Sequence, residues 1–221
     1  GDTFTLTTSA TDVVNGTTGD DTIIGDWATN GTSGTVQASD FIDGGSGNDT
    51  LKLYSFGAGG SDNLPVTDKN VETINFVAPT GALTKVNTAG MSGVTKVVLE
   101  KVDAGTGTFT TGNGQAAQLS TTANTAAALT WAASATDTAA SLTLAGFSDA
   151  GNGLTITGAA TKTLNVNSIT AKNTIALTAP ASVTKLVVTG DKDLNLTAAL
   201  AATVTTVDAA AATGGVTATL L

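Results

Sequence analysis

Residues 35–54, TVQASDFIDGGSGNDTLKLY, contain the stretch that decides the fold of this chain. From Gly44 to Lys52 the sequence matches the nine-residue pattern G-G-x-G-x-D-x-U-x, where U is hydrophobic, at every defined position. The glycines allow a tight turn with inward-facing carbonyls, Asp49 supplies a carboxylate, and Leu51 begins a short strand. The pattern therefore predicts an oxygen-rich turn that leads into a β-strand.

The same turn recurs upstream in the same register. Asp40 lies nine residues before Asp49, and Asp12 lies nine before Asp21. The upstream copy, NGTTGDDTI at 15–23, has threonine at position 17 instead of the second glycine. Such repeats form β-rolls that bind calcium in their turns, so the sequence predicts calcium binding. The alternative interpretation is ordinary Asp/Gly turns that need no ion.

The predicted ligands are carboxylates and turn carbonyls, because calcium prefers about six to eight hard oxygens. Asp12 or Asp21, and Asp40 or Asp49, are expected to be the main ligands. The full predicted set is Asp12, Gly16, Gly19, Asp20, Asp21, Asp26, Asp40, Asp43, Gly44, Gly45, Gly47, Asn48 and Asp49. We expect roughly two to four Ca²⁺ ions.

Acidic side chains concentrate near these turns. Residues 1–72 contain eleven acidic residues and two lysines, a net charge of −9, whereas residues 73–221 contain seven of each sign. Such a cluster repels itself until cations neutralise it, so folding of this part is expected to depend on them. A surface kept acidic for solubility alone would spread its charge along the chain. Nucleic acid is an unfavourable partner for this charge balance.

The composition excludes several kinds of chemistry. The chain has no cysteine, histidine or arginine, which excludes disulfides, imidazole ligands, Ser-His-Asp catalysis and bidentate phosphate recognition. Asp191 and Asp193, which flank Lys192, are interpreted as a solvated turn, so we expect no enzyme. No run of 18 apolar residues occurs, and we expect no membrane insertion. The first residues do not resemble a signal peptide, and we interpret the chain as an excerpt of a longer protein.

From residue 71 onward the sequence has a longer period. The pattern U-x-x-U-x-U starts at 71, 94, 116, 139, 161, 183 and 204, at intervals of 21 to 23 residues, and the copy at 116 is the weakest. Second strands are predicted at 108–110, 129–131, 154–156, 175–177, 194–196 and 216–217. Two strands per period with few aromatic residues predict a parallel β-solenoid; an antiparallel β-sandwich is the alternative.

The predicted fold is therefore all-β, with calcium-binding β-roll turns that continue into a parallel β-solenoid. We expect a roll over residues 1–54, a connecting loop over 55–70 and a solenoid with rungs of about 22 residues over 71–221. The spacing of Asn48, Leu51 and Leu53 repeats the solenoid pattern 23 residues upstream of its first copy. Roll and solenoid are therefore expected to form one continuous stack.

In order, the segments FTLTT, DVVNGTTGDDTII, DFIDGGSGNDTLKL and NVETINF resemble RTX-type surface-layer proteins and related RTX surface proteins of Gram-negative bacteria. The resemblance covers roughly residues 3–76. It implies type I secretion, folding on contact with extracellular calcium, and self-association in a lattice on the bacterial cell surface. Cell-surface polysaccharide or lipopolysaccharide is a further implied partner.

Two other functions remain open. The first is an adhesin or carbohydrate-binding module that uses Trp27, Tyr54, Phe56 or Trp131 as stacking rings. The second is ice binding by rows of threonine. The sequence argues against the second because pairs such as Thr155 and Thr157 are not predicted to recur at matching offsets.

Overall fold

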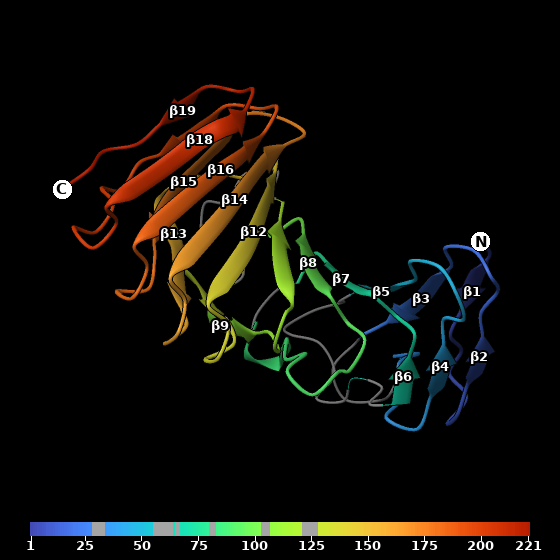
Figure 1. Cartoon of the computed structure of the whole chain (residues 1–221). Coiled ribbons are helices and arrows are strands. Elements are labelled where there is room, and N and C mark those ends of the chain that lie inside the picture. Colours follow the sequence, from blue (N-terminus) through green and yellow to red (C-terminus); the bar gives the residue numbers. More distant parts are fainter. Residues whose placement is uncertain (28–33, 55–63, 65–66, 80–82, 103–106, 121–127) are drawn as a thin grey trace.

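The structure, a computed structural model, describes residues 1–27, 34–54, 64, 67–79, 83–102, 107–120 and 128–221. The chain is a parallel β-solenoid of about 8 turns with rungs of about 23 residues. Its rungs stack from the N-terminal end to the C-terminal end (Figure 1). The only helical element in the described part is a 3-10 turn, η1 (Leu83–Lys85). No described helix has the length and apolar character needed to cross a lipid bilayer.

Three parallel sheets form the walls of the solenoid. The ten-stranded sheet contains, in spatial order, β1 (Thr3–Thr5), β3 (Thr22–Asp26), β5 (Thr50–Tyr54), β7 (Thr73–Val77), β8 (Lys96–Glu100), β10 (Ala116–Leu119), β12 (Ala139–Ala145), β14 (Thr163–Ile169), β16 (Lys185–Gly190) and β18 (Thr206–Ala212). The six-stranded sheet contains β19 (Val216–Thr217), β17 (Leu194–Leu196), β15 (Asn173–Thr178), β13 (Ser148–Thr157), β11 (Leu129–Ala132) and β9 (Gly107–Thr110). The three-stranded sheet contains β2 (Val13–Asn15), β4 (Phe41–Asp43) and β6 (Thr67–Lys69).

The solenoid interior is built from columns of aliphatic side chains, one from each rung. Ile23, Leu51, Ile74 and Val97 occupy one column in strict register, and none of them is exposed to solvent. Alternate residues of each strand point to opposite faces, so the neighbours of these side chains face outward. The predicted solenoid is confirmed, and each of the six predicted second strands overlaps a strand of the six-stranded sheet.

The register differs from a fixed period at several places, of which two illustrate the shift. Leu119 pairs with Leu99, whereas the sequence spacing predicts that it pairs with Val97. Likewise, Leu142 pairs with Val166, two residues beyond the predicted partner. The turns between strands differ in length, so the alignment shifts by two residues. A shift of two keeps the same side chains inside, because side chains alternate with a period of two.

The roll and the long-period region share one sheet, because β5 pairs with β7 along its whole length. Residues 67–69, which the sequence places in the connecting loop, instead form β6 and pair with β4. That part of the prediction is wrong. The strand completes the three-stranded wall of the roll.

Both tryptophans belong to the core. Trp27 is 1% exposed, and its ring centroid lies 4.9 Å from that of Phe76. Trp131 is fully buried and stacks on Phe109 with a centroid distance of 6.2 Å. Neither ring is available to stack on a sugar, which corrects that prediction. Phe56 lies outside the described residues.

Threonines recur on the outer face of the six-stranded sheet. Thr108, Thr130, Thr155 and Thr178 occupy one column on four successive rungs. The Thr-x-Thr pairs do not recur in the same way, because Ala132 separates Thr110 from Thr157 on successive rungs. The fixed period missed this column because the turns between these rungs differ in length.

Candidate functional site

The glycine turns stack directly on one another at the N-terminal end of the solenoid (Figure 1). The Gly16 amide donates to the Asp43 carbonyl at 2.7 Å, and the Ser46 amide donates to the Thr17 carbonyl at 3.0 Å. A Cβ atom on Gly45, whose φ is +90°, would lie 2.2 Å from the Thr17 carbonyl oxygen. Glycine is therefore required here both by the backbone conformation and by the close approach of the two turns.

One corner of the stack carries a column of acidic side chains, Asp21, Asp49 and Glu72, which we call the carboxylate column. The Asp2 amide donates to Asp21 Oδ1, and the Asp21 amide donates to Asp49 Oδ1 at 2.7 Å. The Asp49 amide in turn donates to Glu72 Oε2 at 2.7 Å. Each carboxylate therefore accepts a hydrogen bond from the backbone of the preceding rung.

Glu72 was not predicted as a site residue. It directly precedes β7 and belongs to the first rung of the long-period region. The signal for it was its position 23 residues after Asp49, one solenoid period later. The nonapeptide pattern does not contain this position, so the motif alone did not identify it.

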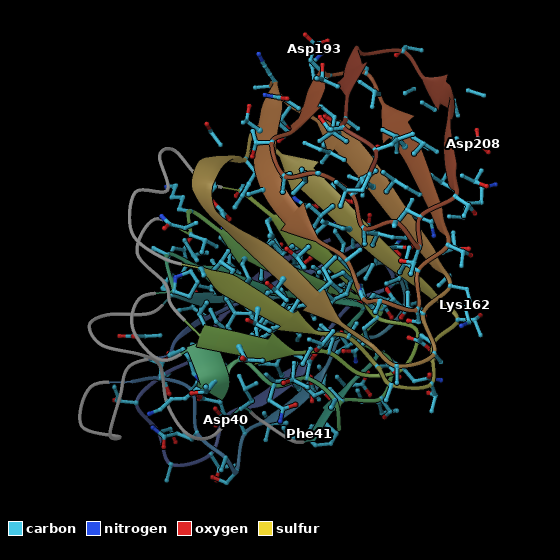
Figure 2. All side chains as sticks on the ribbon, turned by 90° about the vertical axis from the view of Figure 1, so that its left-hand side faces the viewer. Asp40, Phe41, Lys162, Asp193 and Asp208 are labelled. Atoms are coloured by element: carbon cyan, nitrogen blue, oxygen red, sulfur yellow. The ribbon has the colours of Figure 1, made fainter. Side chains whose placement is uncertain are left out.

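Asp12 and Asp40 form a separate stack. The Asp12 amide donates to Asp40 Oδ1 at 2.9 Å, and the Gln37 amide donates to Asp40 Oδ2 at 2.7 Å. Asp12 accepts hydrogen bonds from the amide and the hydroxyl of Thr7 at 2.7 and 2.8 Å. Figure 2 shows Asp40 beside Phe41 at the end of the molecule opposite Asp193 and Asp208. The Asp12 and Asp40 carboxylates therefore accept hydrogen bonds from nearby groups of the chain itself.

The aspartates nine residues apart in the sequence are therefore not neighbours in the structure. Asp12 and Asp40 precede strands of the three-stranded sheet, whereas Asp21 and Asp49 precede strands of the ten-stranded sheet. Residues that meet are 28 positions apart, because one complete rung separates them.

Of the remaining predicted ligands, some lie at the stacked turns, whereas Asp26 lies at the other end of its strand. Asp20 Oδ1 accepts the Asn48 amide at 2.9 Å, and a Cβ atom on Gly47 would lie 2.8 Å from the Gly19 carbonyl carbon. Asp43 contacts the Lys69 ammonium at 3.0 Å, and this hydrogen bond contributes most to lowering the Asp43 pKa. Asp26 ends β3, at the opposite end of the strand from Asp21.

Asp49 has a buried carboxylate oxygen that accepts no hydrogen bond from the described residues. The residue is 0% exposed, and its Oδ2 has no hydrogen-bond donor among the described residues. Burial raises the pKa of Asp49, and the negative charges of Asp21, Glu72 and Asp20 raise it further. An uncompensated buried carboxylate is costly unless a cation or a proton neutralises it.

The space beside this oxygen is created by Gly44. A Cβ atom on Gly44 would lie 2.0 Å from the Asn70 carbonyl oxygen and 2.6 Å from Asp49 Oδ2. Two oxygens from adjacent rungs therefore approach the same point. The described residues contain no group of three or more acidic, histidine or cysteine side chains arranged to hold a metal. A cation here would need main-chain carbonyls as well as carboxylates, and such a set of oxygens suits calcium.

Comparison of the chain with protein-family models, with curated proteins and with solved structures finds no match. The geometry of the chain defines a parallel β-solenoid whose first rungs carry stacked glycine turns and a column of carboxylates.

Proposed function

We propose that this chain is a structural domain of a secreted bacterial surface-layer protein, which binds calcium to stabilise its fold and then self-associates in an extracellular lattice. The observation that carries the proposal is the buried Asp49 carboxylate, which has an unpartnered oxygen within the described residues and lies in a column of acids. The resemblance to RTX surface proteins supports the secretion and the lattice.

The electrostatics favour a divalent ion. Carboxylates on adjacent strands of a sheet lie on the order of 5 Å apart, where two like charges repel by roughly 1 kcal/mol in water and by several times more near a protein surface. One divalent cation removes this repulsion. Extracellular calcium modules bind at about 0.1–1 mM, so such a site fills outside the cell and stays empty in a cytosol poor in free calcium.

Exposed apolar residues support self-association. Val13 is 65% exposed and Phe41 is 40% exposed, and the two pair in register on the outer face of the three-stranded sheet. Large apolar side chains that are exposed together on a sheet face are typical of protein contact surfaces. A second copy of the chain is the partner that a lattice requires.

Calcium is expected to raise the melting temperature. A free calcium concentration one hundred times Kd stabilises a one-site protein by about 2.7 kcal/mol, which corresponds to roughly 5–10 °C for a chain of this size. Differential scanning calorimetry in 10 mM calcium and in EGTA measures this shift. Magnesium at the same concentration is the control. Equal melting temperatures in calcium and in EGTA would contradict calcium binding.

Calcium is also expected to induce assembly, which electron microscopy of the same samples would show as ordered sheets. Val13→Ser combined with Phe41→Ser removes the exposed apolar pair and should reduce assembly while the calcium-induced thermal shift remains. Particles that stay monomeric in calcium would contradict the lattice function but not calcium binding.

A carbohydrate-binding role is the second candidate, and one hollow supports it. A cavity of about 240 Å³ is lined by residues that include Tyr54, Asp26 and Thr35. The Lys52 ammonium lies 5.6 Å from the Tyr54 ring centroid. If the hollow binds sugar, Tyr54→Ala should abolish binding on a glycan array, whereas Thr130→Ala, on a distant outer face, should not change it.

We propose no catalytic role. Asp191 forms an ion pair with Lys192 at 2.7 Å on an exposed turn, and Asp193 Oδ1 accepts the Gly215 amide at 2.8 Å. These contacts support the interpretation of this trio as a solvated turn.

A further inference from the structure

Among the positions at which the two stacked turns differ, the one beside the buried carboxylates is Thr17 in the first turn and Gly45 in the second. The Thr17 amide donates to Asp21 Oδ2, and the Thr17 hydroxyl lies 2.9 and 3.1 Å from the two oxygens of the same carboxylate. The Gly45 amide instead donates to Asp43 Oδ1 at 3.1 Å, and glycine has no hydroxyl. Asp49 Oδ2 therefore has no donor within the described residues, while both oxygens of Asp21 have donors.

The two carboxylates are about equally shielded from solvent. Asp21 is 1% exposed and Asp49 is 0% exposed, and they occupy equivalent corners of adjacent rungs. Hydrogen bonds from the amides of Asp2 and Thr17 lower the pKa of Asp21. Asp49 accepts one backbone hydrogen bond, on Oδ1, and its Oδ2 accepts none from the described residues. The first turn therefore stabilises its own negative charge, and the second does not.

The oxygens around the two glycines are otherwise alike. A Cβ atom on Gly16 would lie 1.9 Å from the Gly44 carbonyl oxygen and 2.8 Å from Asp21 Oδ2, which matches the arrangement of Asn70 and Asp49 around Gly44. Both turns thus bring a carbonyl and a carboxylate oxygen together. Only at the second is the carboxylate oxygen without a donor in the described structure.

We propose that the carboxylate column contains one divalent-cation site, at the second turn. Its ligands are Asp49 Oδ2 and the Asn70 carbonyl, with Glu72 supplying the neighbouring negative charge. In the first turn, the Thr17 hydroxyl and amide take the place of an ion. This inference rests on the proposed function in taking calcium as the ion.

The position of the site gives it a structural role. Asp49 ends the second turn of the roll, whereas Glu72 begins the first long-period rung, and the Glu72 carbonyl accepts the amides of Thr95 and Lys96 at 2.8 and 3.0 Å. A cation beside both acids therefore ties the roll to the rung on which the rest of the solenoid stacks.

The test is the number of calcium ions bound per chain, measured by equilibrium dialysis at saturating calcium and by isothermal titration calorimetry. Asp49→Asn should bind one ion fewer than the wild-type chain. Thr17→Gly should bind one ion more, because it removes the hydroxyl that contacts both Asp21 oxygens and has no counterpart at Gly45. Asp21→Asn should bind as many ions as the wild-type chain.

Folding of the variants is checked by circular dichroism in EGTA. Asp49→Asn removes an uncompensated charge, so its melting temperature in EGTA should equal or exceed that of the wild-type chain. This measurement separates loss of the ion from loss of the fold. An unchanged ion count in Asp49→Asn or in Thr17→Gly would overturn the inference, as would a lower count in Asp21→Asn. Absence of calcium binding by the wild-type chain would instead overturn the proposed function.

Discussion

Replacement of Trp131 by alanine is expected to lower the free energy of unfolding by about 3–5 kcal/mol. The indole is fully buried in β11, where it stacks on Phe109 with an interplanar angle of 2°. Its Nε1 also donates to the buried Thr111 hydroxyl at 2.9 Å, so the variant leaves both a cavity and an unpaired polar group. Urea denaturation followed by circular dichroism measures the loss.

The matched control is Thr130→Ala, one residue earlier on the same strand. Thr130 faces outward, and a surface change of this kind alters stability by about 0.5 kcal/mol or less. Equal losses for the two variants would contradict the inward position of Trp131. A large loss for Trp131→Ala alone confirms that the interior of this rung is packed around the indole.

Replacement of Asp68 by asparagine is expected to stabilise the chain at pH 7.5 by up to about 3 kcal/mol. Asp68 pairs with Ile42, which pairs with Val14, so the three share the inward face of the three-stranded sheet. Asp68 Oδ2 is buried without a hydrogen-bond partner in the described structure. Burial raises the Asp68 pKa from 3.8 to about 6.

The sign of the pH dependence follows from the raised pKa. Above pH 6 the folded chain contains a buried charge, and this penalty disappears as Asp68 becomes protonated on acidification. In EGTA, the wild-type chain should therefore gain stability from pH 7.5 to pH 5.0. Asp49, whose pKa is also raised, contributes in the same direction. In Asp68→Asn the gain should be smaller.

The control for this prediction is Asp191→Asn. The hydrogen bond from Lys192 lowers the pKa of the exposed Asp191 carboxylate, so its loss should slightly destabilise the chain at pH 7.5. Urea denaturation at pH 7.5 and pH 5.0 measures the free energy of unfolding of the wild-type chain, Asp68→Asn and Asp191→Asn. The prediction is contradicted if the wild-type chain loses stability from pH 7.5 to pH 5.0 and Asp68→Asn shows the same change of stability with pH.

Local sequence predicted most of the fold because strand formation here depends on alternation. Leu51 and Leu53 alternate with Lys52 and Tyr54, and this pattern requires a strand with one buried face whatever the length of the adjacent turns. Short runs such as 154–156 and 194–196 were identified for the same reason. The prediction of register was weaker, since Leu119 and Val166 both pair two residues away from a fixed period.

The candidate site was predicted in part. The nonapeptide correctly marked Asp21 and Asp49 as residues at glycine turns, and Thr17 as a departure from the pattern. It did not show that Asp12 and Asp40 would satisfy their oxygens with amides of Thr7 and Gln37. The motif also omitted Glu72, because this residue contributes from a rung with a different repeat.

The sequence by itself determined that this chain is a stack of parallel strands with glycine turns and most of its negative charge at one end. These properties depend on residue type and on spacing within one rung. Only the tertiary structure decided which acids meet and that Asp49 Oδ2 accepts no hydrogen bond from the described residues. The physical reason is that contacts between rungs join residues far apart in the sequence, such as Asp21 and Asp49, which are 28 positions apart. The lengths of the loops set this offset, and these lengths follow no sequence pattern.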